Sequence, residues 1–136
     1  MRTYDVDGFI LGKNPSPTGG GFTVAVDDDI ISYTILEPGI TNNQTELLAI
    51  GCAAYLAQPG DEIRTDSQTA YHWVKSGQCK ARPDLSPTAR IIKKWVREKQ
   101  LQVIWAPREV NRAGQYNETG LQRMPQESLD ICPKLC

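Results

Sequence analysis

Residues 4–11, Tyr4-Asp5-Val6-Asp7-Gly8-Phe9-Ile10-Leu11, form the stretch around which the rest of the chain is organised. Their apolar and β-prone side chains predict a strand, on which Asp5 and Asp7 share one face because side chains alternate along a strand. Phe9 and Leu11 continue that face, so at least one acid is expected beside buried apolar surface. A carboxylate there is costly unless it is paired, hydrogen-bonded or bound to a metal ion.

Gly8 follows Asp7 directly and removes a side chain at a point where another group can approach the backbone closely. The alternative for this stretch alone is that Asp5 and Asp7 are solvent-facing acids on an edge strand. The residues that favour a functional role for Asp7 lie further along the chain.

The size and composition fit one ordinary globular domain. The chain has 136 residues, of which 40% are hydrophobic and 23% charged, as is typical of soluble proteins. The longest apolar run, residues 47–57, is too short to cross a bilayer, and the N-terminus does not resemble a signal peptide. These features predict a cytoplasmic protein without a membrane partner.

The four cysteines, Cys52, Cys79, Cys132 and Cys136, show no CxxC spacing. Cys52 lies within an apolar helical pattern and is expected in the core. Cys132 and Cys136 could pair or bind a metal, but no histidine lies near them, and we favour free thiols in a reducing cytoplasm.

Positive charge is concentrated in residues 75–99, although the formal net charge of the chain is only −1. This segment has two acidic residues against eight basic ones: Lys75, Lys80, Arg82, Arg90, Lys93, Lys94, Arg97 and Lys99. A local basic surface suits contact with a phosphate backbone. The alternative is a solvated helix face.

Hydrophobic periodicity and turn residues predict an α/β fold with the element order βββαβαβα. The expected strands cover residues 3–12, 22–26, 30–36, 62–66 and 101–106, and the expected helices cover 42–58, 67–75, 86–99 and a last one from about 113. The first three strands are short-linked and should form an antiparallel meander, whereas the later strands follow helices and should be parallel. The result is a five-stranded mixed sheet flanked by helices.

Helix starts can also be assigned. Asn43 with Glu46 three residues later resembles a capping box, Ser67 can cap the second helix, and Pro87 suits the first turn of the third.

Three acids from distant segments should converge in this topology. If the first strand pairs with the fourth, Asp7 lies beside Asp66 at the carboxyl end of a strand, and Glu46 can reach the same point. Three carboxylates would repel each other unless a cation joins them, and oxygen ligands of this kind suit Mg²⁺ or Mn²⁺, often as a pair of ions. Taken singly, Glu46 could instead be a capping residue, Asp66 a helix-start acid and Asp7 a surface acid.

The motifs of the chain resemble those of the ribonuclease H family, type 1, in its bacterial and plant-like members. The resemblance covers residues 3–118 in order. It rests on Asp7-Gly8, Asn14-Pro15-Ser16-Pro17 with the glycines after it, Thr41-Asn42-Asn43-Gln44-Thr45-Glu46-Leu47, Thr65-Asp66-Ser67-Gln68, residues 80–87 and residues 105–111.

The resemblance implies a nuclease that cuts the RNA strand of RNA–DNA hybrids, with two Mg²⁺ or Mn²⁺ ions as cofactors. Asp7, Glu46 and Asp66 would be the catalytic metal ligands, and a metal-activated water would leave products with 5′-phosphate and 3′-hydroxyl ends. The residues that would contact the hybrid are Asn14, Asn42, Asn43, Ser67 and Gln68. We expect a monomer with a catalytic domain over residues 1–118 and a C-terminal tail of unassigned structure over 119–136.

The resemblance fails at the fourth acid, which the family carries at the start of the last helix. Gln115 occupies that place here. We favour Glu118, three residues further on the same helix face, as the substitute catalytic and metal-binding acid. The rivals are Asn117 or Gln115 holding a metal-bound water, and a Glu118 that is only a surface acid.

A second departure concerns histidine and the basic protrusion. The only histidine, His72, lies in a predicted helix, and the loop before the last helix has none. The protrusion of some relatives is absent, so phosphate binding would fall to Lys80, Arg82 and the Lys93, Lys94 and Arg97 face.

Two rival functions remain. One is a relative of the same fold that acts on another nucleic acid or was once attached to a polymerase. The other is a non-catalytic or weakly active hybrid-binding module with an altered fourth metal ligand.

Overall fold

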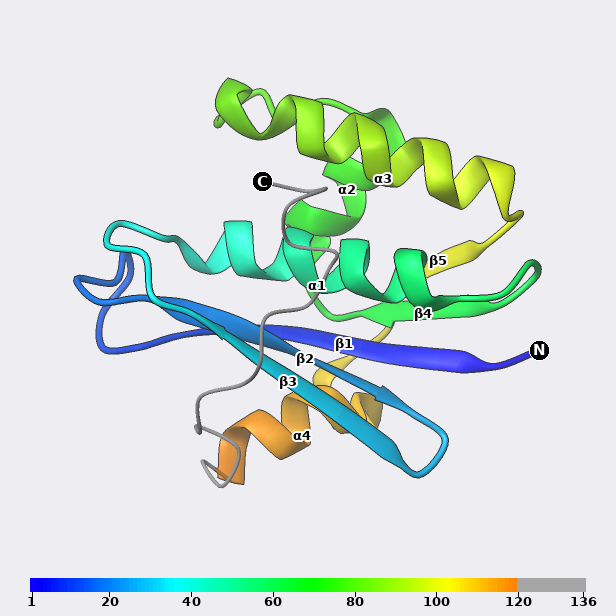
Figure 1. Cartoon of the computed structure of the whole chain (residues 1–136), viewed down its shortest axis with the longest axis horizontal. Helices are drawn as coiled ribbons and strands as arrows, with labels where there is room; N and C mark the ends of the chain where they lie inside the picture. The colour runs from blue at the N-terminus through cyan, green and yellow to red at the C-terminus, as the bar shows by residue number, and fades with distance from the viewer. Residues whose placement is uncertain (120–136) are drawn as a thin grey trace.

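A five-stranded mixed sheet lies between helices on both of its faces in the computed structural model, which describes residues 1–119 (Figure 1). The strands are β1 (Thr3–Ile10), β2 (Gly20–Val26), β3 (Asp29–Ile35), β4 (Glu62–Thr65) and β5 (Gln102–Trp105). Their order across the sheet is β3-β2-β1-β4-β5. β1 and β3 are antiparallel to β2, whereas β4 is parallel to both β1 and β5. The predicted order and pairing are therefore confirmed.

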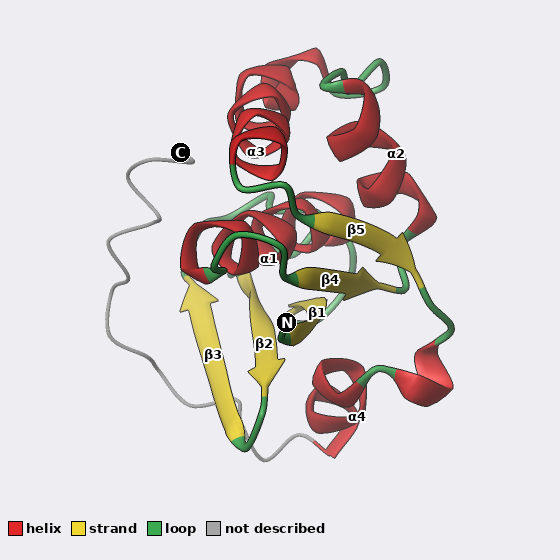
Figure 2. Cartoon of the chain, turned by 90° about the vertical axis from the view of Figure 1, so that its right-hand side faces the viewer, coloured by secondary structure: helices red, strands yellow, loops and turns green. Residues whose placement is uncertain are grey.

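The helices are α1 (Asn42–Leu56), α2 (Gln68–Ser76), α3 (Ser86–Glu98) and α4 (Arg112–Thr119). Two short 3₁₀ turns, η1 (Pro83–Leu85) and η2 (Arg108–Val110), precede α3 and α4. Figure 2 shows α1, α2 and α3 on one side of the sheet and α4 on the other. No described helix has the length and apolarity that a membrane crossing requires.

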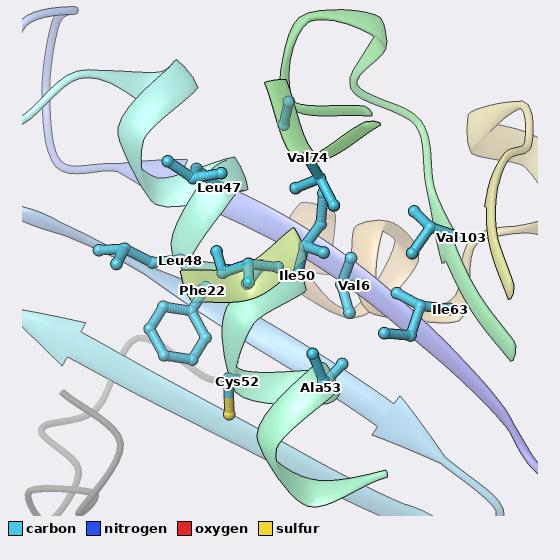
Figure 3. Packing of buried hydrophobic residues seen from close by; sticks show 14 of the residues in the cluster. Val6, Phe22, Leu47, Leu48, Ile50, Cys52, Ala53, Ile63, Val74 and Val103 are labelled. Atoms are coloured by element: carbon cyan, nitrogen blue, oxygen red, sulfur yellow. The ribbon is translucent and has the colours of Figure 1, made fainter. Parts of the chain in front are cut away.

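The main core fills the space between the sheet and helices α1–α3. Val6, Ile63 and Val103 point from three neighbouring parallel strands toward Ile50 of α1 and Val74 of α2 (Figure 3). Each of these side chains is at most 1% exposed, and burying one contributes about 1.5–3 kcal/mol. The predicted core position of Cys52 is also confirmed.

β1 is a central strand, so Asp5 and Asp7 are not surface acids on a sheet edge. Their exposed fractions are 0% and 1%. They point to the face of the sheet that α4 covers, while Tyr4 and Val6 point into the main core.

The capping box expected at α1 is wrong. Thr41 is the N-cap, and its hydroxyl accepts a hydrogen bond from the Gln44 backbone N–H at 3.3 Å. Asn43 is already within the helix, and Glu46 turns to β1 instead of back to a cap. The predicted cap of α2 is confirmed, because Ser67 accepts from the Ala70 N–H at 3.1 Å.

Lys99 has a structural role that the charge count did not anticipate. Its ammonium group donates to the carbonyls of Ala54, Tyr55 and Ala57 at 2.8, 2.8 and 3.0 Å. These are carbonyls at the end of α1 that lack helical partners. Lys99 therefore does not belong to the phosphate-binding surface. Cys132, Cys136 and nearly all of the expected tail lie outside the described residues.

Candidate metal centre

Three carboxylates from separate elements meet at the carboxyl end of β4. Asp7 lies within β1, Asp66 directly follows β4, and Glu46 lies in α1. Val6 pairs with Thr65 across the parallel β1–β4 ladder, which places Asp7 next to Asp66. One oxygen of each carboxylate lies within 4.8 Å of the other two. The structure thus brings together the three acids singled out from the sequence.

Gly8 allows Glu46 to reach this point. A Cβ atom at Gly8 would lie 2.3 Å from the Thr45 hydroxyl oxygen and 2.6 Å from the Glu46 backbone nitrogen. Because the glycine has no side chain, α1 rests directly on β1, and the Gly8 N–H donates a hydrogen bond to Glu46 Oε1.

Burial raises the pKa values of all three acids, and repulsion within the group adds to this for Asp7 and Glu46. Burial is the largest cause for Asp7, and with the nearby Asp66 charge it raises the pKa of Asp7 to about 6. The pKa of Glu46 lies well above its ordinary value because of burial first, and then because of the Asp7 and Asp66 charges. Burial also raises the pKa of Asp66. The centre is therefore short of positive charge.

Arg108, from η2, supplies part of that charge. Its guanidinium lies 3.3 Å from Asp7 Oδ2 and 3.7 Å from Asp66 Oδ2. Among the described residues no salt bridge reaches Glu46. Because one guanidinium cannot balance the charge of three carboxylates, the group keeps a net negative charge that a divalent cation would neutralise. Its donors are all oxygen atoms, which suit Mg²⁺ or Mn²⁺.

The three positions considered for the fourth ligand have different surroundings. Glu118 is 60% exposed and accepts from Arg108 Nε at 3.0 Å, outside the carboxylate group. Gln115 is exposed and donates from Nε2 to the Glu109 carbonyl at 2.7 Å. Asn117 is buried, and its Nδ2 donates to Asp7 Oδ2 at 2.9 Å. In this structure Asn117 is therefore the one of the three that touches a carboxylate of the group.

Asp5, two residues before Asp7, is neutralised by protein charges. Arg64 donates to it through Nε at 2.6 Å and Nη2 at 3.0 Å, and Arg112 donates through its backbone N–H and Nε, each at 3.1 Å. Burial pushes the pKa of Asp5 upward, but the hydrogen bonds from the two arginines outweigh it and hold the pKa below its ordinary value. Asp5 therefore joins α4 and β4 to β1.

Three of the expected hybrid-contacting residues surround the start of α1. Asn14 Oδ1 accepts from the Asn42 N–H at 3.1 Å, and Arg82 Nη1 donates to the Thr41 hydroxyl at 3.4 Å. Arg82 also pairs with Asp84 at 2.8 Å, so part of its charge is already used.

The remaining expected contact residues are spread over neighbouring surfaces. Asn43, Gln68 and Lys80 are exposed. Ser67 is engaged as the cap of α2.

A basic groove of about 390 Å³ lies between α2 and α3. Its lining residues are Ser76, Gly77, Gln78, Arg90, Lys93, Lys94 and Arg97. Next to it a shallow depression of about 710 Å³ is lined by His72, Trp73, Lys75 and Lys80, among others. Four of the five basic residues predicted to bind phosphates thus line two adjoining surfaces, whereas Arg82 lies at the start of α1.

Trp105 is a site residue that sequence reasoning missed. It ends β5 with 44% of its surface exposed, and its indole N–H donates to the Asp66 carbonyl at 3.1 Å. An aromatic residue at the carboxyl end of a strand, one strand away from a candidate ligand, was the signal that could have identified it.

No protein-family model matches the sequence, and no curated protein matches it. Solved structures do match. LC11-RNase H1 in complex with an RNA/DNA hybrid is similar with a TM-score of 0.68 and 23% identity over 87% of this chain and 95% of that chain. LC11-RNase H1 isolated from compost by a metagenomic approach gives a TM-score of 0.68 and 24% identity over 86% and 93%. The N-terminal RNase H domain of a Mycobacterium tuberculosis protein was solved as a fusion with maltose-binding protein. It gives a TM-score of 0.61 and 15% identity over 89% of this chain and 96% of that chain.

Proposed function

The chain has the fold of ribonuclease H type 1, and from this premise we propose that it is a metal-dependent endonuclease that hydrolyses the RNA strand of RNA–DNA hybrids. The products would carry 5′-phosphate and 3′-hydroxyl ends. The observation that carries the proposal is the buried group of Asp7, Glu46 and Asp66, whose oxygens lie within 4.8 Å of one another. The hybrid bound by the similar LC11-RNase H1 supports the substrate.

Asp7, Glu46 and Asp66 would hold two Mg²⁺ or Mn²⁺ ions, which supply an activated water and neutralise charge on the leaving oxygen. The chain itself fixes the carboxylates: the Gly8 N–H holds Glu46, and the Trp105 indole holds the backbone of Asp66. We retain Glu118 as the proposed fourth ligand. It would have to leave Arg108, with which it pairs in this structure.

The hybrid would be recognised by short polar side chains and by the basic groove. Asn14, Asn42, Asn43, Ser67 and Gln68 have amide and hydroxyl groups suited to 2′-hydroxyls and phosphates, and the 2′-hydroxyl distinguishes RNA from DNA. Lys80, Arg82 and the basic groove would take backbone phosphates. We place this activity in residues 1–118 of a monomeric, cytoplasmic protein.

A cleavage assay on an RNA–DNA hybrid labelled in the RNA strand, with Mg²⁺ or Mn²⁺, tests the proposal. We expect the wild-type protein to cut the RNA and Asp7→Asn to abolish cutting, because the substitution removes a ligand charge. The matched control is Asp28→Asn, the same change at an exposed position, which should cut normally. Hybrid binding without cutting by the wild-type protein would favour the non-catalytic alternative, and cutting by D7N at the wild-type rate would refute the proposed site.

A further inference from the structure

A chain of buried hydrogen bonds leads from β3 to Asp7 beneath the candidate metal centre. These bonds run between the sheet and α4, the helix that covers this face of the sheet (Figure 2). Ser32 Oγ lies 3.2 Å from Thr23 Oγ1, Thr23 Oγ1 lies 2.6 Å from Asn117 Oδ1, and Asn117 Nδ2 lies 2.9 Å from Asp7 Oδ2. The four residues are between 0% and 5% exposed. Water therefore does not compete for these bonds.

The chemistry of the groups gives every bond in this chain one direction. Thr23 has a single hydroxyl hydrogen, which it donates to the Asn117 oxygen, an atom that can only accept. Ser32 must then be the donor to Thr23. Each donor points toward Asp7, so the bonds reinforce one another and end on the carboxylate.

The Asp7 carboxylate, which can only accept, fixes the orientation of the Asn117 amide. Its oxygen faces the Thr23 hydroxyl, and its nitrogen faces Asp7. The reversed amide would place its oxygen against the Asp7 carboxylate, where two acceptors repel each other. An amide binds a cation through its oxygen, and the Asn117 oxygen faces the Thr23 hydroxyl, whereas its nitrogen faces Asp7. Asn117 in this arrangement is therefore not a metal ligand.

We propose that Asn117 is a positioning residue of the metal centre, which holds Asp7 Oδ2 through its amide nitrogen. Oδ2 is thereby committed to Asn117 and Arg108, and Oδ1 of Asp7 would be the oxygen that holds the cation. Thr23 acts one step further back, because it orients the amide. The link to catalysis rests on the proposed nuclease function, whereas the link to metal affinity concerns the protein alone.

Calorimetric titration with Mn²⁺, without hybrid, tests the proposal. We expect Asn117→Ala to weaken Mn²⁺ binding about tenfold or more, as removal of a group that orients a ligand does. Thr23→Val keeps the shape of the side chain but removes the donor, and it should weaken binding in the same direction. Thr23→Ser restores the hydroxyl and should rescue the affinity. Gln102→Ala, an exposed amide at the start of β5 and away from the carboxylates, is the matched control and should bind as the wild type does.

The outcomes distinguish the positioning role of Asn117 from the proposed nuclease function. If folded N117A binds Mn²⁺ as tightly as the wild type, or if T23V equals T23S, the proposal is wrong. If N117A does not fold, the comparison of T23V with T23S decides alone. A wild-type protein that binds Mn²⁺ with the expected variant pattern but cuts no hybrid leaves Asn117 in its role and refutes the nuclease function. If the wild-type protein cuts hybrids while N117A keeps full Mn²⁺ affinity, the nuclease function stands and the role of Asn117 is refuted. A wild type that binds no Mn²⁺ refutes both the role of Asn117 and the nuclease function.

Discussion

At the scale of single residues, Asp5 and Asp7 show how surroundings separate two acids on one face of one strand. Asp5 is enclosed by Arg64 and Arg112, and its pKa is lowered. Asp7 lies beside Asp66, and its one guanidinium partner, Arg108, is 3.3 Å away. The pKa of Asp7 is raised to about 6. The first acid therefore serves folding, and the second is available for a cation.

Removal of the Asp5 charge should destabilise the fold. Asp5→Asn leaves Arg64 and Arg112 without their carboxylate, and because both arginines are partly solvated we expect a loss of about 3 kcal/mol, the lower end for a broken buried pair. Urea denaturation in EDTA at pH 8 measures it. Asp7→Asn is the matched control and should not lose stability, since it removes a repelled charge. A loss below about 1 kcal/mol, typical of exposed pairs, would contradict the structural role of Asp5.

The stability of the metal-free fold should fall as the pH rises, because the pKa values of Asp7, Glu46 and Asp66 are raised in the folded state. The folded Asp7 keeps its proton up to about pH 6, whereas the unfolded residue loses it near its ordinary pKa of 3.8. The native state binds more protons between these values, so this contribution is complete below pH 3.8 and is lost as the pH rises through about 6. Glu46 and Asp66 act in the same direction.

Denaturation of the metal-free protein at pH 5 and pH 8 tests this sign. We expect lower stability at pH 8, and a smaller difference in the Asp7→Asn variant. The lowered pKa of Asp5 acts below its ordinary value of 3.8 and does not disturb the comparison. A metal-free wild type that is equally stable at both pH values would show that the three acids are not repelled.

At the scale of elements, the centre depends on how closely α1 approaches β1. Gly8 sets this distance, because a Cβ atom there would overlap the backbone of Thr45 and Glu46. These are backbone atoms in the first turns of α1, which cannot move aside as the end of a flexible side chain can. The glycine of the Asp-Gly pair therefore positions Glu46, although it carries no chemistry itself.

Gly8→Ala should move α1 and separate Glu46 from Asp7. We expect a stability loss of about 1–3 kcal/mol, as for an overpacked core, together with weaker Mn²⁺ binding. Gly114→Ala is the control, because the nearest atom to its Cβ would be an ordinary 3.6 Å away and alanine favours a helix. Thermal melts and Mn²⁺ titrations of both variants provide the measurement. Unchanged Mn²⁺ affinity in G8A would show that close helix approach does not set the centre.

At the scale of the whole molecule, opposite charges occupy different surfaces. The acids gather at the carboxyl end of β4, and the basic groove lies between α2 and α3. The net charge of −1 conceals this separation. Under the proposed function, a nucleic acid would be held by one surface and cut at another.

Binding of an RNA–DNA hybrid should weaken with salt, because binding to the phosphate backbone releases counterions. Replacing Lys93 and Lys94 by alanine should weaken binding and reduce the slope of log K against log salt by about 1 for each phosphate that the groove no longer neutralises. Fluorescence anisotropy in EDTA at several salt concentrations measures the slope. Lys13→Ala, an exposed lysine outside the groove, is the control and should leave the slope unchanged. A wild-type binding constant insensitive to salt would refute the basic groove.

Local features of the sequence predicted most of the fold. Alternating apolar residues and the turn formers between them placed the strands and helices, and short connections predicted the antiparallel meander. The capping box failed because Thr41 and Asn43 both suit a helix start, and Glu46 had a stronger partner in the Gly8 N–H. The structural role of Lys99, which was counted with the basic segment, could not be predicted because its carbonyl partners lie more than 40 residues away.

The sequence by itself determined the order of the elements and the choice of Asp7, Glu46 and Asp66, because periodicity and short motifs are local properties. Only the tertiary structure decided that Asp5 is neutralised and that Asn117 lies on Asp7, since these partners are 59, 107 and 110 residues apart. A side chain's partner depends on which surfaces packing brings together, and no local pattern encodes that.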